Sequence, residues 1–241
     1  MKPWKLSLLV FSISLLPAIA VLQAKYNVLK TDRSTAAANR VVTDLQSRFV
    51  QLDLTWGSPV FLRIFKEPKE LEVWIQSTEE TFKLFRTYPI CTFSGNLGPK
   101  LKEGDYQAPE GFYSVSPSAM NPRSRFHLSF NLGYPNRYDR AHKRTGSALM
   151  VHGNCVSIGC YAMGDDNIEE IYTLCANALD GGQDAFQVHC FPFHLTDQNL
   201  KEYRDHPWYS FWLNLKEGYD YFEFHSYPPS VSVKDRSYHF K

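Results

Sequence analysis

The sequence predicts a β-rich α+β domain with peripheral helices, and three observations support this class. Short runs of β-branched and aromatic residues recur from position 59 onward, separated by polar turns. One amphipathic segment over 165–182 predicts a buried helix. With 241 residues, 44% hydrophobic and 15% aromatic, the chain can bury one substantial core and is not mainly disordered. We therefore expect one domain with terminal additions.

Residues 1–20 predict an export signal. Lys2 and Lys5 precede an apolar run, and small residues allow cleavage after Ala20 or Ala24. The alternative is an uncleaved inner-membrane anchor with the domain facing the periplasm, although the run is short for a bilayer span. Removing residues 1–20 takes away two lysines and no acidic residue, so the formal net charge changes from +1 to −1. A chain this neutral has no basic surface typical of nucleic-acid binding.

Residues 25–56 are predicted to form either a linker or an N-terminal helix. Val41, Leu45 and Phe49 recur near helical spacing, but a tether between the leader and the domain fits the composition equally well. The main domain is expected over 57–241, with a helical and strand extension at its C-terminal end.

The expected strands follow in order along the main domain. Three of them form an antiparallel meander, "VFLRIF", "LEVWIQ" and "TFKLFRTY", and three more are "GFYSV", "HLSFNLG" and "AFQVHCFPF". Two short aromatic helices, "TDQNLKEYR" and "PWYSFWLNLK", then precede a tail strand near "VSVKDRSYHF".

The helix over 165–182 is the clearest element of the sequence. Asp165 or Asp166 is expected to cap it, and the pair Gly181-Gly182 to end it. Its buried face is expected to carry Ile168, Ile171, Tyr172, Cys175 and Leu179.

The segment just before this helix concentrates reactive side chains. His152, Cys155 and Cys160 lie within nine residues, which is compatible with a nucleophile and its base, part of a metal site, or a disulfide beside a structural histidine. Cys160 follows Gly159 and precedes the helix, so backbone N–H groups could face a developing negative charge. Cys155 is interpreted as a buried thiol or a disulfide partner of Cys91, Cys175 or Cys190.

A zinc site is the weaker alternative for these residues. Cys155, Cys160 and His152 could supply three ligands and His189 or Cys190 a fourth, but the spacing matches no zinc pattern, and we expect no metal or other cofactor. Five cysteines in an exported chain leave at least one thiol outside any internal disulfide.

Three linked motifs resemble the L,D-transpeptidase (YkuD-domain) family. "HGNCVSIGCYAM" resembles its active-site signature, "GPKLKEGDYQAPEGFYSV" its glycine-rich strand entry, and "NLGYPNRYDRA" the lead-in to the active site. The short gap from histidine to cysteine and the form "SIGCYAM" look like the YafK-like branch. The resemblance implies a YkuD-like catalytic domain with a sandwich-like arrangement of antiparallel strands. It also implies that the protein is exported to the periplasm and acts on peptidoglycan there.

The resemblance also implies roles for individual residues. Cys160 would attack the L-centre carbonyl of diaminopimelate in a stem peptide and form a thioester. His152 would be the base, with its ring oriented by the Gly153 carbonyl. Pocket and oxyanion roles fall on Ser157, Gly159 and Tyr161. Substrate binding is expected from the lead-in residues Tyr134, Arg137 and Arg140.

An amine would resolve the thioester to a crosslink or exchange product, and water would hydrolyse it. The YafK-like branch is associated with hydrolysis that frees a lipoprotein from peptidoglycan, so stem peptides and a peptidoglycan-linked lipoprotein are the expected partners. A non-catalytic wall-binding module is the rival from another class, because Ile158 stands where the family usually has a histidine. The sequence specifies neither the oligomeric state nor the disulfide pairing.

Overall fold

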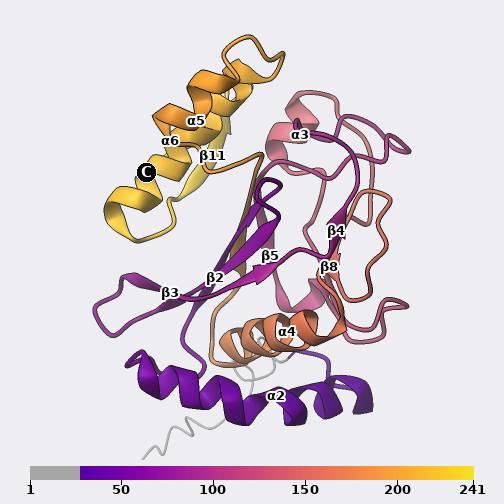
Figure 1. The fold of residues 1–241 in the computed structure, drawn as a ribbon, viewed down its shortest axis with the longest axis vertical. Helices are drawn as coiled ribbons and strands as arrows, with labels where there is room; N and C mark the ends of the chain where they lie inside the picture. The colour runs from indigo at the N-terminus through magenta and orange to yellow at the C-terminus, as the bar shows by residue number, and fades with distance from the viewer. Residues whose placement is uncertain (1–27) are drawn as a thin grey trace, which may run out of the picture.

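Two five-stranded β-sheets and their flanking helices make up the computed structural model, which describes residues 28–241 (Figure 1). One continuous apolar core contains side chains from both sheets and from the two long helices packed beside them. The structure thus confirms the predicted α+β class. The predicted export signal lies outside the described residues. Over 28–241, no helix is both long and apolar enough to cross a membrane.

The first sheet has the strand order β3-β2-β1-β10-β5. Strands β1 (Val60–Phe65), β2 (Glu70–Gln76) and β3 (Phe82–Pro89) form the expected antiparallel meander. Strand β10 (Phe186–Phe191) pairs with β1 in parallel and with β5 (Gly111–Val115) in antiparallel fashion. All six residues of β1 are buried, as a central strand covered on both faces requires.

The second sheet has the order β4-β9-β8-β7-β6 and carries the candidate site. Its short strands are β4 (Thr92–Phe93), β6 (Met120–Asn121), β7 (Ser129–Asn131), β8 (Met150–His152) and β9 (Tyr161–Ala162). Most strand pairs are antiparallel, as expected, but β8/β9 and β1/β10 are parallel, which the sequence did not predict. Parallel pairing requires a crossover connection, and only the tertiary structure shows where the chain makes one.

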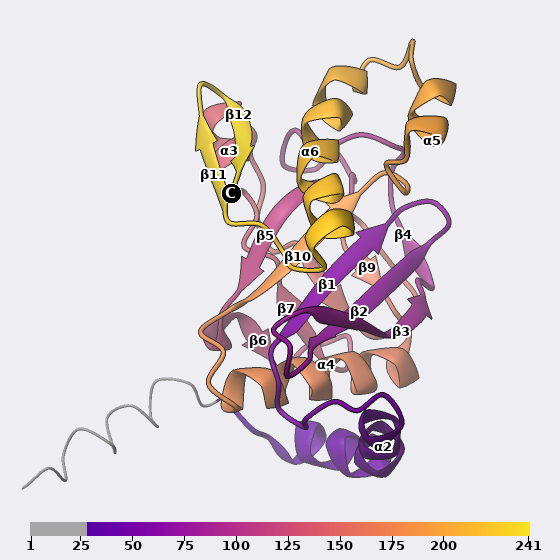
Figure 2. The same cartoon turned by 90° about the vertical axis from the view of Figure 1, so that its left-hand side faces the viewer.

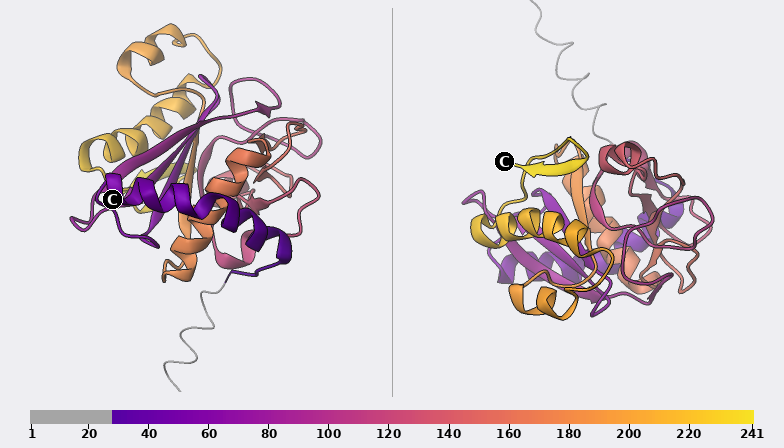
Figure 3. Two further views of the ribbon diagram at one scale, coloured as in Figure 1. Left: turned by 60° about the horizontal axis from the view of Figure 1, so that its bottom comes forward. Right: turned by 90° about the horizontal axis from the view of Figure 1, so that it is seen from above.

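Two long helices cover one side of the sheets. Helix α2 (Asp32–Gln51) occupies the segment for which the sequence left a linker or a helix open, and it packs across α4 (Asp165–Asp180), as Figure 3 shows. Gly164 is the N-cap of α4 and Gly181 the C-cap. The expectation that Asp165 or Asp166 caps the helix is therefore wrong, because both lie in its first turn. The predicted apolar face of α4 is buried.

The C-terminal extension packs against the first sheet (Figure 2). It comprises α5 (Asp197–Glu202), α6 (Tyr209–His225) and the hairpin of β11 (Val231–Lys234) and β12 (Ser237–Phe240). The hairpin replaces the single tail strand expected from the sequence, because Asp235 and Arg236 both adopt positive φ and reverse the chain between two strands. The remaining elements are the 3₁₀ turn η1 (Pro117–Ala119) and the short helix α3 (Arg137–Ala141).

Candidate active site

His152 and Cys160 are brought together by the parallel pair β8/β9. Val151 pairs with Tyr161 and His152 with Ala162, so Cys160 immediately precedes β9 while His152 ends β8. Side chains alternate between the two faces of a sheet. Val151 and Tyr161 belong to the apolar core, so the alternation and the register place His152 and Cys160 on the opposite face as diagonal neighbours. The nine-residue motif from His152 to Cys160 thus becomes one local site.

The imidazole of His152 is held in a defined tautomer. Its Nδ1 lies 2.5 Å from the carbonyl oxygen of Gly153, and because a carbonyl only accepts, Nδ1 carries the hydrogen and Nε2 is the basic nitrogen. The ring of Phe126 stacks on the imidazole at 4.7 Å between centroids. Burial lowers the pKa of His152, so the ring is neutral near neutral pH.

The loop that carries Phe126 is fastened from two sides. The Gly153 N–H group donates to the carbonyls of Phe126 and Leu128, each at 3.1 Å. From helix α2, Arg33 Nη1 donates to the carbonyls of Ser124 and His127 at 2.6 and 2.9 Å. The N-terminal helix therefore supports the aromatic ring that shields His152, although no residue of α2 lies in the sequence motif.

Gly153 is constrained by its surroundings as well as by its carbonyl. A Cβ atom at this position would lie 2.6 Å from Asp165 Oδ1 and 2.9 Å from the Phe126 carbonyl oxygen. Asp165 also accepts a hydrogen bond from the Asn154 N–H group at 2.7 Å. The first turn of α4 thus anchors the chain between His152 and Cys160 and leaves no room there for a larger residue.

The Cys160 thiol opens into a cavity of about 230 Å³. Its Sγ lies 3.7 Å from the Ala148 carbonyl oxygen. Burial raises the pKa of Cys160, while the backbone of Met150 and the charge of Lys100 oppose that shift. Within the described chain no hydrogen bond joins the Cys160 and His152 side chains. The resting pair is therefore a thiol beside a neutral imidazole, and the proton would move only on reaction.

The residues assigned to the oxyanion pocket differ in how close they lie to the Cys160 cavity. Gly159 lines the cavity and has a φ of 139°, which favours glycine. Ser157 Oγ accepts hydrogen bonds from the amides of Gly159 and Cys160 at 3.2 and 3.0 Å, so an oxyanion would compete with this hydroxyl for both donors. Tyr161 is buried and donates to the Pro109 carbonyl at 2.7 Å. Tyr161 is therefore not among the residues that line the Cys160 cavity.

Cys155 is joined to Cys91 in a disulfide. The bond ties the loop between β8 and β9 to the segment that precedes β4. This confirms the interpretation of Cys155 as a disulfide partner and removes its thiolate from the zinc set considered above. Cys175 and Cys190 are free but buried, and burial raises the pKa of both thiols. Cys160 is thus the partly exposed free thiol of the described chain.

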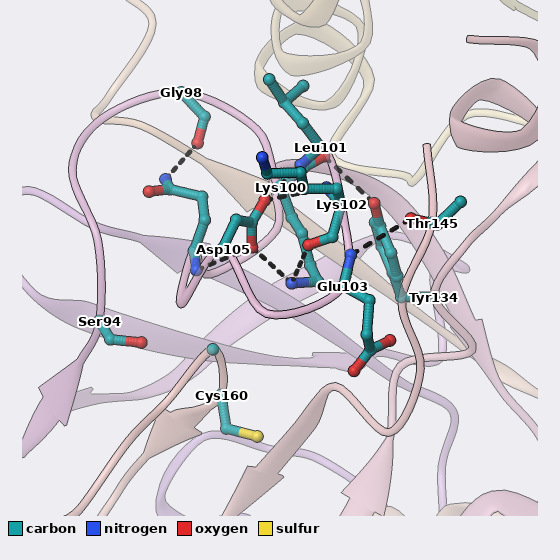
Figure 4. Close-up of polar contacts among 12 residues, drawn as sticks. Ser94, Gly98, Lys100, Leu101, Lys102, Glu103, Asp105, Tyr134, Thr145 and Cys160 are labelled. Atoms are coloured by element: carbon teal, nitrogen blue, oxygen red, sulfur yellow. Dashed lines mark hydrogen bonds and ion pairs between the residues drawn. The ribbon is translucent and has the colours of Figure 1, made fainter. Parts of the chain in front are cut away.

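A loop over residues 94–107 forms the rim above Cys160 (Figure 4). Asp105 is its hub and accepts hydrogen bonds from the amides of Leu101, Lys102 and Gln107 at 2.8 to 3.1 Å. Lys100 Nζ lies 2.5 Å from Asp105 Oδ1 and 2.9 Å from the Lys102 carbonyl oxygen. The rim is therefore closed on itself by hydrogen bonds.

A buried ion pair fastens this rim to the first sheet. Lys66 and Glu110 are both fully buried, with 3.0 Å between Nζ and Oε1. Lys66 donates to the carbonyls of Asn96 and Gly98, and Glu110 accepts from the Gly98 amide at 2.7 Å and from Trp212 Nε1 at 2.9 Å. The C-terminal helix α6 thereby contributes to the position of the rim.

The three lead-in residues predicted to bind substrate do not line the Cys160 cavity. Tyr134 is buried and donates from its hydroxyl to the Lys100 carbonyl at 3.1 Å, so it supports the rim. Arg137 and Arg140 are exposed on α3 and line a separate cavity of about 640 Å³ beside β5 and the C-terminal hairpin. The loop expected for the two arginines is a short helix, capped by Asn136.

Several residues of the site escaped the sequence interpretation. Phe126 covers His152, while Lys100, Glu103 and Tyr106 line the cavity with Cys160. The glycine-rich stretch around Lys100 was recognised as a family motif, but nothing local shows that it lies above the thiol. The contacts of Arg33 span more than 90 residues of sequence and leave no periodic signal.

Comparisons with known proteins identify the family of the chain. Residues 72–188 match the YkuD family model, described as the L,D-transpeptidase catalytic domain. The chain is 47% identical over 182 residues to YafK of Escherichia coli K12, whose name places it in the same family, covering 76% of this chain and 74% of that one. YafK of E. coli O157:H7 gives the same values.

Two solved structures share less with the chain. The helical cell shape determining protein Pgp2 of Campylobacter jejuni is 17% identical, with a TM-score of 0.46 over 75% of each chain. Bd1075 of Bdellovibrio bacteriovorus is 16% identical, with a TM-score of 0.40 over 76% of this chain and 84% of that one. On the family model and the 47% identity, this chain belongs to the YkuD-domain L,D-transpeptidase family.

Proposed function

We propose that the protein is a periplasmic cysteine acyltransferase that acts on peptidoglycan stem peptides through Cys160. The observation that carries this proposal is the placement of His152 and Cys160 on one face of the parallel pair β8/β9, with the thiol open to a cavity. Family membership supports a peptidoglycan-modifying reaction. Periplasmic action follows from the predicted export signal and from the location of that substrate.

The proposed reaction has two steps. Neutral His152 takes the Cys160 proton at Nε2 as Sγ attacks the L-centre carbonyl of diaminopimelate, and the imidazolium then protonates the departing amine, which leaves a thioester. In the second step an incoming amine or water loses a proton to His152 and attacks the thioester, which releases the Cys160 thiol. An amine gives a crosslink or exchange product, and water gives a hydrolysed stem.

Hydrolysis is the second candidate outcome. If the departing amine belongs to a peptidoglycan-linked lipoprotein, the same two steps detach that lipoprotein and the protein is an amidase. The support for this outcome is the resemblance of the form "SIGCYAM" to the YafK-like branch, which is associated with such hydrolysis. Both outcomes require the same thioester on Cys160.

The test is mass spectrometry of the protein and its products. The mature chain and its Cys160→Ala variant are incubated with a diaminopimelate-containing disaccharide tetrapeptide and with a lipoprotein-linked muropeptide. We expect a thioester adduct on the unsubstituted chain alone. Crosslinked or exchanged products would identify a transpeptidase, and a freed lipoprotein peptide without a new crosslink an amidase. Absence of adduct and turnover, with retained binding to sacculi, would instead identify a wall-binding module.

A further inference from the structure

Of the charged side chains that line the Cys160 cavity, one has an ion-pair partner within the described chain and one does not. Two charged side chains line it, Lys100 and Glu103. The Lys100 ammonium is almost fully buried and is already paired with Asp105 at 2.5 Å. The carboxylate of Glu103 accepts no hydrogen bond and makes no ion pair within residues 28–241. An unpaired negative charge therefore borders the cavity that contains the candidate nucleophile.

Glu103 is held in place by its backbone. Its N–H group donates to Thr145 Oγ1 at 3.2 Å, and the Thr145 N–H group in turn donates to the Leu101 carbonyl at 3.1 Å. Figure 4 shows the Glu103 side chain extending from the rim on the side where Cys160 lies. The backbone of Glu103 is thus held in place, while its exposed side chain is free to turn toward a ligand.

The rest of the cavity wall is largely apolar. Tyr106, Leu149 and Ile158 line it together with the thiol, and Ile158 is 76% exposed at its mouth. An apolar wall beside an unpaired carboxylate is complementary to an aliphatic chain that ends in an ammonium group. A chain that ended in a carboxylate without an ammonium would instead be repelled by Glu103.

We infer that Glu103 is a specificity-determining residue that binds the side-chain ammonium of the acylated residue, the D-centre amine where that residue is diaminopimelate. This inference rests on the proposed function, since it assumes that the donor residue is attached to Cys160. The aliphatic part of the donor side chain lies along Tyr106 and Ile158, and the ammonium is bound by Glu103. The ammonium, more than any carboxylate on the same side chain, then distinguishes good donors from poor ones.

Binding to the Cys160→Ala protein tests this inference without turnover. Calorimetry compares three stem peptides: one with diaminopimelate, one with its D-centre amine acetylated, and one with lysine, which keeps an ammonium and lacks the second carboxylate. Because hydrogen bonds to charged groups are strong, we expect acetylation to weaken binding about tenfold. Glu103→Gln in the same background should abolish that difference and weaken the lysine peptide as well. Glu79→Gln, which removes a charge from the exposed β2/β3 turn, is the matched control and should change nothing.

Two results would overturn the inference. One is a Glu103→Gln protein that still binds the unmodified peptide about tenfold more tightly than the acetylated one. The other is a Glu103→Gln protein that keeps the same ratio of affinities for the unmodified and acetylated peptides but binds a free acceptor amine more weakly. That result would assign Glu103 to the acceptor. The proposed function is tested separately by the thioester on the unsubstituted chain, so the two failures are distinguishable.

Discussion

Replacement of Glu110 by alanine should destabilise the protein strongly, because it leaves a buried charge without a partner. The carboxylate is fully buried and contacts Lys66 at 3.0 Å, the Gly98 amide at 2.7 Å and Trp212 Nε1 at 2.9 Å. Breaking one side of such a pair costs about 3–5 kcal/mol. For a domain of this size the cost corresponds to a fall in Tm of roughly 6–20 °C.

Urea unfolding followed by circular dichroism measures this cost in the parent and in Glu110→Ala.

The pH dependence of stability tests the same ion pair. Burial lowers the pKa of Lys66 in the folded protein. The unfolded chain therefore binds more protons than the folded one between that lowered pKa and the ordinary value of 10.5. Stability should rise with pH in this window, and more so in Glu110→Ala, since the orphaned lysine can then lose its proton.

A variant that keeps the shape of Glu110 and removes its charge separates loss of the ion pair from loss of packing. Glu110→Gln keeps an acceptor for Trp212 but leaves the Lys66 charge unpaired, so its cost should approach that of the alanine variant. The double variant Lys66→Met with Glu110→Gln removes both charges and should recover most of the loss. Single variants within about 1 kcal/mol of the parent, or a double variant no better than the singles, would refute this reasoning.

Three further predictions concern the site and its supports. The acid limb of kcat/KM should lie below the ordinary histidine pKa of 6.5, because burial lowers the pKa of His152; a flat profile through that range would separate His152 from the reaction. The pKa of Glu169 is lowered, chiefly by its hydrogen bond from Arg40. The stability that Glu169 contributes is therefore present above about pH 4.5 and is lost as pH falls through the lowered pKa. Acid titration of Glu169→Gln should show a shallower loss of folding stability than the parent shows. Replacing Cys91 and Cys155 by alanine should cost about 4 kcal/mol in urea unfolding, as expected from opening a loop with a sequence separation of 64; a change below about 1 kcal/mol would show that the unfolded chain is not constrained by the disulfide.

Local patterns in the sequence were sufficient for much of the fold. The meander of β1 to β3 follows from short β-branched and aromatic runs with polar turns between them, and the buried face of α4 follows from apolar residues at helical spacing. The proposed site could also be predicted from the sequence, because His152 and Cys160 belong to one contiguous motif. Such features involve neighbours along the chain, whose spacing determines which face they share.

Long-range pairing was decided only in the folded structure. Which cysteine joins Cys155, the parallel pairing of β1 with β10, and the position of Arg137 away from the thiol all depend on contacts between segments far apart in the chain. Periodicity reports which face of a strand is buried, but not which strand lies beside it. For the same reason Glu103 could be recognised only when the rim was seen above Cys160, where its unpaired charge acquires a chemical meaning.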